Sequence, residues 1–494
     1  MGKVKQLAGQ TAVYGLSSIL GRILNYLLVP LYTRVFLPHE SAVYVELYAY
    51  MAILAVILTY GMETAFFRYS ETHSKPKMVY STAFNSIVIT TILFLLFTLT
   101  FRDSIASWLG YEGKTEYIIY FLLILGFDAL SAIPFAWLRA QQKAWTFAGI
   151  KLANIFINIA LNLILILLLP YLYNKYGWSW LGIFTGGKPE VSAIFISNMV
   201  ASFATLLLLW PAIRKASLTI DLGLWKEMFL YAFPLLVYNL AGVINETIDR
   251  ILLKHFLPPE TAIHDLGVYG MCFKFSVFIV IFIQAFRYAA EPFFFKQAKE
   301  KDAPETYAMV MNYFIIVCFG MFAGIMLFID VIKYFVGPMY YAGLPIVPLL
   351  LMGHVFLGIY YNLSVWYKIT GKTMYGAWFS LIGTAVTIGL NIFLIPRIGF
   401  MGSAWANFSC YLLMMLLSFI YGQKHYPIPY RLDKFFLYLT LSIALFLIGS
   451  KIHLPWLGLD LVIKGILFVL FFIIVLRKEP ELRQALILAV PKRR

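Results

Sequence analysis

The chain has 494 residues, of which 61% are hydrophobic and only 13% charged, and its formal net charge is +15. Soluble domains average about 45–50% apolar and about 25% charged residues, so this composition excludes an ordinary soluble protein. Long apolar runs follow one another from end to end, whereas a membrane β-barrel would show alternating segments of about ten residues. The sequence therefore predicts an all-α polytopic membrane protein.

Fourteen apolar stretches are long enough to be transmembrane helices, each of which needs about 20 residues to cross the hydrocarbon core. The first stretch does not look like a cleaved signal peptide, because it is long and contains Arg22 and Asn25. The connecting loops are short, so no segment is large enough for a soluble catalytic domain. In chain order the predicted spans cover residues 11–35, 42–66, 80–101, 116–138, 146–170, 191–212, 227–256, 267–290, 306–330, 345–367, 374–396, 401–421, 433–450 and 457–476.

The distribution of Lys and Arg sets the expected orientation. The side that holds both termini has 24 of these residues, and the opposite side has 8. Because loops rich in Lys and Arg stay in the cytoplasm, both termini are predicted to be cytoplasmic. This bias also accounts for most of the net charge, so no nucleic-acid partner is expected.

Two segments of the chain recur. "RVFLPHE" (34–40) closes the first span and "KHFLPPE" (254–260) closes the seventh, and at the same shift Asn25 falls on Asn245. Residues 138–166 likewise resemble 367–395, with a Leu-Asn pair at matching places. Six spans separate the copies, and an even number gives both copies the same orientation, as in a parallel repeat.

The repeat predicts two six-helix lobes around a central cavity, a layout that favours a transporter with alternating access. Spans 13 and 14 have no counterpart and look appended. The expected divisions are an N-lobe with helices 1–6 (1–222), a C-lobe with helices 7–12 (223–425), and a third part with helices 13–14 and a basic cytoplasmic tail (426–494).

Span 7 carries a polar stripe. Asn239, Gly242, Glu246, Asp249 and Arg250 follow helical spacing and share one face. A charge at the centre of a membrane helix costs about 2.5–3.5 kcal/mol on insertion scales, so this face is expected to contact protein or water rather than lipid. A Glu246–Arg250 ion pair four residues apart is compatible with either surrounding.

Other spans hold charges that follow the same logic. In span 1, Gly15, Ser18, Arg22 and Asn25 form a similar stripe. Glu46 and Arg34 near outer helix ends are expected to extend toward the membrane surface. Lys464 in span 14 is expected either to extend to the surface from the cytoplasmic side or the lipid face, or to bind a partner, rather than to line the cavity. The remaining cavity candidates are Lys274 in span 8, Lys151 in span 5, Asp128 in span 4 and Glu63 near the cytoplasmic end of span 2.

Bases prevail among the cavity candidates, and this favours an anionic substrate, since Arg offers bidentate hydrogen bonds to phosphate and Lys a point charge. The chain has no G-x-x-x-x-G-K-[ST] loop, no H-E-x-x-H and no paired C-x-x-C. The three cysteines, Cys272, Cys318 and Cys410, lie far apart in apolar runs and are expected to be core residues. We therefore expect neither an enzyme nor a cofactor or metal.

With its 6 + 6 + 2 spans, its two "FLP" helix ends and the "LRAQQKAWTFAG…LN" stretch, the chain resembles the bacterial polysaccharide exporters. These are the Wzx-type flippases of the multidrug/oligosaccharidyl-lipid/polysaccharide superfamily. The resemblance covers nearly the whole chain, although its motifs are patterns rather than invariant residues.

The resemblance implies a substrate: an oligosaccharide on undecaprenyl diphosphate, moved from the cytoplasmic to the periplasmic leaflet of the bacterial inner membrane. Expected partners are this lipid-linked substrate, membrane lipids, H⁺ or Na⁺, and polysaccharide assembly proteins. The diphosphate and sugars would contact a basic and amide set, and acids would serve in ion coupling or as charge partners. The first set comprises Arg22, Asn25, Arg250, Lys274, Lys151 and Asn245, and the second Glu246, Asp249, Asp128 and Glu63.

Two alternatives stay open. A lipid II flippase or an ion-coupled drug or cation antiporter of the same superfamily would share the fold, but an antiporter would be expected to have more acids in its cavity. A membrane polysaccharide polymerase or ligase usually needs a large external loop, and the sequence has none.

Overall fold

The computed structural model describes residues 19–177, 188–452 and 454–482, together with Gly15, Ser17 and Gln484. Ser18 of the predicted span 1 stripe, the start of that span and the basic tail beyond residue 484 lie outside the described residues. Throughout the described part of the chain, the regular elements are helices and no strand occurs.

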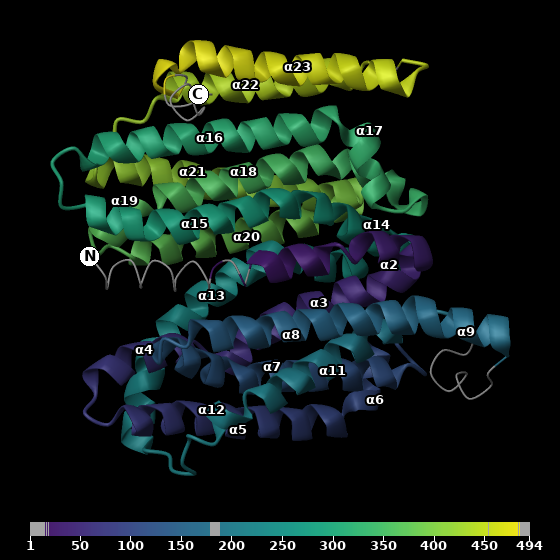
Figure 1. The fold of residues 1–494 in the computed structure, drawn as a ribbon, viewed down its shortest axis with the longest axis vertical. Coiled ribbons are helices and arrows are strands. Elements are labelled where there is room, and N and C mark those ends of the chain that lie inside the picture. Colours follow the sequence, from purple (N-terminus) through teal and green to yellow (C-terminus); the bar gives the residue numbers. More distant parts are fainter. Residues whose placement is uncertain are drawn as a thin grey trace, which may run out of the picture. The chain divides into compact units, whose positions relative to one another are not determined.

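The first half of the chain forms the helices shown from purple to teal in Figure 1. Residues 19–26 are helical. The helices that follow are α2 (Val29–Val35), α3 (Pro38–Thr59), α4 (Met62–Thr72), α5 (Pro76–Thr100), α6 (Arg102–Trp108), α7 (Thr115–Ala140), α8 (Ala144–Leu163), α9 (Leu169–Tyr176), α11 (Ser192–Leu208), α12 (Trp210–Ile213), α13 (Leu222–Phe256) and α14 (Pro259–Cys272).

The second half continues in the same way, in green and yellow in Figure 1. Its helices are α15 (Val277–Gln297), α16 (Ala303–Leu327), α17 (Ile329–Ile332), α18 (Val347–Leu363), α19 (Val365–Ile369), α20 (Met374–Ile398), α21 (Phe400–His425), α22 (Leu432–Gly449) and α23 (Leu457–Lys478).

Among the described residues, 12 helices are long and apolar enough to cross a membrane. Each coincides with one predicted span, and the shorter apolar helix α11 (Ser192–Leu208) lies where span 6 was predicted. The all-α polytopic fold is therefore confirmed, and the expectation of fourteen spans is compatible with the structure.

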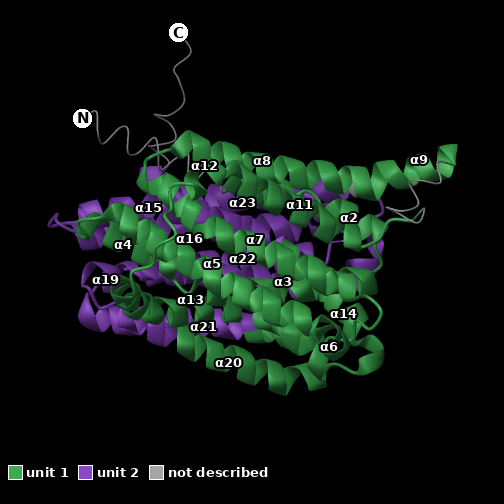
Figure 2. Cartoon of the chain, turned by 90° about the horizontal axis from the view of Figure 1, so that it is seen from below, with its two compact units in different colours: residues 1–274, 380–406 green, residues 275–379, 407–494 purple. Residues whose placement is uncertain are grey.

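By contacts the chain divides into two compact units, coloured in Figure 2. Unit 1 holds residues 1–274 and 380–406, and unit 2 holds 275–379 and 407–494. In unit 1, α3 packs on α7, α13 and α14, while α11 packs on α7 and α8. In unit 2, α16 packs on α18, α22 and α23, so the two helices predicted as appended rest on α16. The division into an N-lobe and a C-lobe follows the repeat rather than these contacts and stays a prediction.

The two "FLP" segments form the same kind of turn. Leu37 (φ −72°, ψ 158°) and Leu257 (φ −79°, ψ 156°) are both extended. Leu37 directly precedes α3, whereas Pro258 lies between Leu257 and α14. Pro38 begins α3 and Pro259 begins α14, which is favourable because the first turn of a helix needs no proline N–H. The Glu40 carboxylate also accepts a hydrogen bond from the Leu37 N–H at 2.8 Å.

Helices α3 and α14 approach each other closely at two glycines. A Cβ on Gly267 would lie 1.8 Å from the Pro38 carbonyl oxygen, and one on Gly270 would lie 2.4 Å from Val45 Cγ1. Only glycine fits at such distances. In the predicted topology these contacts lie in the outer half of the membrane.

Candidate functional site

The polar stripe of α13 contains a buried acid held by two neighbours. Asp249 is 2% exposed, and Tyr269 of α14 donates a hydrogen bond to its Oδ2 at 2.5 Å. Arg250 Nη1 lies 3.8 Å from Asp249 Oδ1. The Arg250 guanidinium also lies over the Phe273 ring, 4.2 Å from its centroid. The structure therefore joins the acid and the base of this helix into a partly buried pair.

The Glu246–Arg250 ion pair that the spacing allows is not the one formed. Arg250 Nη1 donates to the main-chain carbonyl of Glu246 at 2.8 Å and pairs with Asp249 instead. The side chain of Glu246 is exposed. A charged residue that is exposed in the middle of an apolar helix marks a face where water, lipid headgroups or substrate must be in reach.

The helix at residues 19–26 presents Arg22 and Asn25, both exposed. Asn25 Oδ1 accepts a hydrogen bond from Asn158 Nδ2 of α8 at 3.1 Å. Two further hydrogen bonds extend this contact into an amide ladder. Asn162 Nδ2 donates to Asn158 Oδ1 at 3.1 Å, and Tyr32 donates to Asn162 Oδ1 at 2.8 Å. This amide ladder fixes the first helix against α8 and leaves Arg22 accessible.

The second half of the chain repeats the amide arrangement in part. Asn245 Nδ2 donates to the Ser380 carbonyl of α20 at 3.2 Å. Asn391, the repeat partner of Asn162, is likewise fully buried. Each donates to the carbonyl four residues earlier, at 2.8 Å for Asn162 and 2.7 Å for Asn391. Sequence matching of the two Leu-Asn pairs thus predicted a shared local structure.

Lys274 lies in a break of the predicted span 8. Residues Phe273–Ser276 form a 3₁₀ turn between α14 and α15. Tyr26 of the first helix donates to the Lys274 carbonyl at 2.5 Å, and Lys274 Nζ lies 5.6 Å from the centroid of the Tyr44 ring. This turn brings a half-buried cation next to the helix that carries Arg22.

Asp128 and Lys151 are brought together by folding. No acid lies near Lys151 in the sequence, yet the Asp128 and Lys151 charges interact in the fold. Asp128 also forms a hydrogen bond with Ser202. Lys151 Nζ lies 4.2 Å above the Phe135 ring, and the Asp128 residue is exposed. Lys151 is therefore a balanced base, whereas the sequence suggested a surplus one.

Glu63, expected as a coupling or partner acid, is an ion-pair partner. It pairs with Arg139 at the end of α7, and the Arg139 guanidinium also lies 4.8 Å from the centroid of the Phe67 ring. Both side chains are partly exposed. The pair joins the first turn of α4 to the last turn of α7.

Two buried ion-pair clusters were missed, and each contains a pair between distant parts of the chain. Glu46 was expected near the membrane surface, but it is 1% exposed and lies 2.8 Å from Lys254 Nζ. Lys464 was also expected to extend outward. Instead it is 1% exposed, with its Nζ 2.7 Å from Asp330 and 2.8 Å from Asp460. The i,i+4 spacing of Asp460 and Lys464 was a local signal for that pair. The distant pairs left only a shared predicted depth of the partners.

Unit 2 holds a further charged cluster that the sequence analysis did not single out. Glu291 Oε1 lies 2.7 Å from Lys368 Nζ and 3.5 Å from Arg287 Nη2. The Arg287 guanidinium stacks on Tyr361 at 4.1 Å. A small cavity adjoins these groups and is also lined by Asn362, whose buried Nδ2 has no acceptor among the described residues. Arg287, Lys368 and the Asn362 N–H group outnumber the single carboxylate of Glu291, so this cavity favours binding of an anion.

Among the candidate charges of unit 1 that the structure describes, Arg22, Glu246 and Asp128 are accessible, and Arg250, Lys274 and Lys151 are half-buried. Such groups can hold a polar or charged molecule inside a membrane. Within the described part of the chain, no cluster of three or more His, Cys, Asp and Glu residues could hold a metal ion. Cys272, Cys318 and Cys410 are buried and are not joined by disulfides among the described residues.

Comparison with known proteins shows the family to which this chain belongs. A family model described as "Polysaccharide biosynthesis protein" matches residues 7–297. The chain is thus a polytopic membrane protein whose family match covers more than half of its length. It belongs to the polysaccharide biosynthesis protein family.

One curated relative is "Lsg locus putative protein 1" of Haemophilus influenzae. It is 21% identical over 302 residues, which are 59% of this chain and 66% of the relative, so the match spans slightly less than two thirds of that protein. Two solved structures share the fold. A lipid II flippase MurJ in an inward closed conformation matches with a TM-score of 0.71 and 14% identity over 94% of this chain and 99% of that chain. An inward-facing multidrug resistance MATE family transporter has a TM-score of 0.63 and 13% identity over 84% and 94%.

Proposed function

We propose that this protein is a flippase for oligosaccharides linked to undecaprenyl diphosphate. It moves them from the cytoplasmic to the periplasmic leaflet of the bacterial inner membrane for the synthesis of cell-surface polysaccharide. The observation that carries the proposal is the set of accessible and half-buried bases within the membrane spans of a polysaccharide biosynthesis family member. A lipid-linked diphosphate needs such bases inside the membrane.

In this mechanism the diphosphate binds Arg22, Arg250 and Lys274. Arg22 is exposed on the first helix, and Lys274 is tied to that helix through Tyr26. Arg250 shares its charge with Asp249, so it can offer its remaining donors to phosphate without leaving a buried charge unpaired. The exposed amide of Asn25 is suited to sugar hydroxyls, whereas Asn245 is 3% exposed and bonds to the Ser380 carbonyl in this conformation. Lys151 contributes a fourth positive charge, balanced by Asp128.

Transport proceeds by alternating access of two lobes, 1–222 and 223–425, with both termini in the cytoplasm. Glu246 and Asp128 are the candidates for coupling to H⁺ or Na⁺, because both are accessible within the membrane spans. Asp249 and Glu63 are already engaged with Arg250 and Arg139 and serve as charge partners. No cofactor takes part, and polysaccharide assembly proteins are the expected macromolecular partners.

The test is flipping in proteoliposomes. Purified protein is reconstituted with a labelled oligosaccharide on undecaprenyl diphosphate, and its exposure is followed with a membrane-impermeant sugar-modifying enzyme. We expect protein-dependent exposure, reduced at least tenfold by Arg22→Ala, Arg250→Ala or Lys274→Ala. A tenfold loss corresponds to about 1.4 kcal/mol, within the range of one charged hydrogen bond.

The matched control is Arg397→Ala. Arg397 is an exposed arginine of α20 that bonds to its own helix at the Phe393 carbonyl and stacks on the Phe393 ring. Its loss should leave flipping unchanged. Full flipping by all three test variants would refute the phosphate-anchoring role.

A second candidate function, ion-coupled antiport, is favoured by the accessible acids. Asp128 and Glu246 would suit an ion-coupled drug or cation antiporter, and the MATE transporters share the fold. Proton-driven efflux of a cationic dye, lost with Asp128→Asn and without any oligosaccharide flipping, would favour that function.

A further inference from the structure

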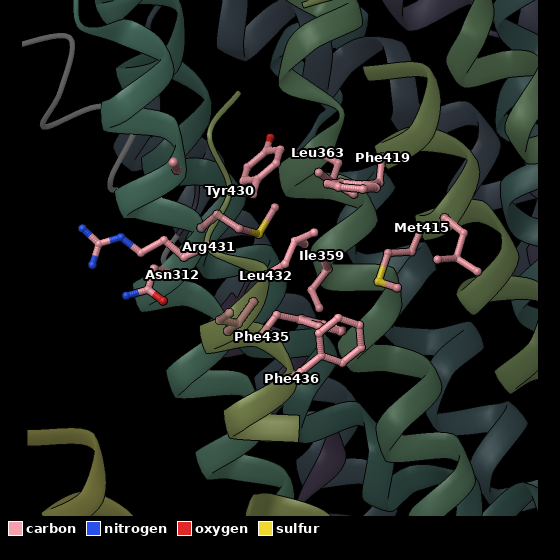
Figure 3. A pocket seen from close by; sticks show the side chains of 14 residues that line it. Asn312, Ile359, Leu363, Met415, Phe419, Tyr430, Arg431, Leu432, Phe435 and Phe436 are labelled. Atoms are coloured by element: carbon pink, nitrogen blue, oxygen red, sulfur yellow. The ribbon is translucent and has the colours of Figure 1, made fainter. Parts of the chain in front are cut away.

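Two adjoining cavities lie on one side of unit 2. The first encloses about 720 Å³ of space, partly open to the surroundings, and the second about 750 Å³. They share the lining residues Ala308, Asn312 and Arg431, so they adjoin each other and together make up a two-part cleft. Figure 3 shows the first of them.

The first cavity is apolar. Its lining comes from α16, α18, α21 and the start of α22, with side chains such as Met311, Ile359 and Phe435. Phe436 at its edge is 60% exposed and Leu432 46%, so the groove opens on an apolar surface of the molecule. A groove of this kind in a membrane protein fits a hydrocarbon chain.

The second cavity is polar and rich in acids. Glu305, Glu479, Glu481 and Arg431 line it, and Lys434 Nζ lies 3.0 Å from Glu479, so the acids exceed the nearby bases by one. Burial alone would raise the pKa of Glu479, but hydrogen bonds from Tyr438, Lys434 and Asn312 lower it below its usual range. Glu479 is therefore a carboxylate at neutral pH, and the cavity favours a positive group beside a negative one.

Asn312 stands where the two cavities meet. It is 5% exposed, and its Oδ1 has no hydrogen-bond donor among the described residues. In Figure 3 the Asn312 amide and the Arg431 guanidinium lie at the same edge of the groove, away from Met415 and Phe436. A buried acceptor without a donor is costly, so this edge calls for a ligand that brings an N–H group.

We infer that this cleft binds a phospholipid with a primary-amine headgroup. One acyl chain lies along the apolar groove, the phosphate contacts Arg431, and the ammonium group points toward Asn312 Oδ1 and the carboxylates. The predicted topology puts the start of α16 and the loop before α22 at the cytoplasmic surface, the depth of phospholipid headgroups. The lipid-linked substrate fits poorly here, because its diphosphate would face three carboxylates.

This inference does not depend on the proposed transport function. Native mass spectrometry of the purified protein, titrated with phosphatidylethanolamine or phosphatidylglycerol of equal chain length, tests it directly. We expect phosphatidylethanolamine to bind at least tenfold more tightly, because phosphatidylglycerol lacks the ammonium group. Equal affinities for the two lipids would overturn the inference.

Variants place the binding in this cleft. Asn312→Leu removes the unpaired acceptor, and Glu305→Gln removes an exposed carboxylate with little risk to folding. Each should weaken phosphatidylethanolamine binding several-fold and leave phosphatidylglycerol binding nearly unchanged. Arg431→Gln should weaken both lipids, because both carry the phosphate.

Arg214→Gln is the matched control. Arg214 also lies at a predicted cytoplasmic helix end, but it stacks on Trp210 in unit 1, 5.1 Å from the ring centroid, and lines neither cavity. Lipid binding that resists Asn312→Leu and Glu305→Gln would place the lipid elsewhere and overturn the inference. Tight binding of undecaprenyl diphosphate that Asn312→Leu abolishes would reassign the cleft to the substrate and overturn it as well.

Discussion

At the scale of single residues, Glu46 shows how far a charge can depart from its expected surroundings. Its carboxylate is buried, with Lys254 at 2.8 Å, and Tyr111 donates a hydrogen bond to the same oxygen. Lys254 also donates to the Leu109 carbonyl. The pair thus joins α3, α13 and the loop after α6 at the predicted outer side of unit 1.

Glu46→Gln is expected to destabilise the protein by about 3 kcal/mol, because removing one partner of a buried ion pair leaves the other charge uncompensated. Thermal unfolding of the purified protein in detergent measures this as a clear drop in Tm. Glu116→Gln serves as the control, since Glu116 pairs with Lys114 at 3.8 Å on the surface, where such pairs contribute about 0–1 kcal/mol. Equal losses in both variants would show that the Glu46 pair is no more important than a surface one.

At the scale of elements, the contact between α3 and α14 depends on Gly267. The missing side chain lets the Pro38 carbonyl approach to where a Cβ would stand, 1.8 Å away. Since the clashing atom belongs to the backbone, it cannot rotate aside, and the helices themselves must separate.

Gly267→Ala is therefore expected to destabilise unit 1 by about 1–3 kcal/mol, the usual range for overpacking. Gly149→Ala on α8 is the control, because nothing lies within 4 Å of its added Cβ. Alanine is the better helix former by about 0.8–1.0 kcal/mol, so this control should be neutral or slightly stabilising. Unfolding temperatures of both variants in the same detergent decide the matter, and an unchanged Tm for Gly267→Ala would contradict the close contact.

At the scale of the whole molecule, the orientation in the membrane still rests on the distribution of Lys and Arg. Two exposed loop residues report on it: Ser74 between α4 and α5, and Glu112 between α6 and α7. In a background without the three buried cysteines, an impermeant maleimide should label Glu112→Cys in intact cells. Ser74→Cys should react only after the membrane is opened. The reverse pattern would place both termini outside and reverse the proposed direction of transport.

The sequence by itself determined the class of fold, since every described membrane helix coincides with a predicted apolar span. A membrane helix must satisfy its backbone hydrogen bonds internally and present about 20 apolar residues, and both requirements are local in sequence. Matching short segments also pointed to the two similar "FLP" helix ends and to the two aligned asparagines, Asn162 and Asn391, which are both buried.

The tertiary structure alone decided which charges meet. Asp128 reaches Lys151, Glu46 reaches Lys254, and Lys464 reaches Asp330, across 23, 208 and 134 positions of the chain. Helical periodicity says which face of a helix carries a charge, but not which helix packs against that face. That choice depends on close packing between helices, such as the glycine contact of α14 with α3, and it turned several expected surplus charges into balanced pairs.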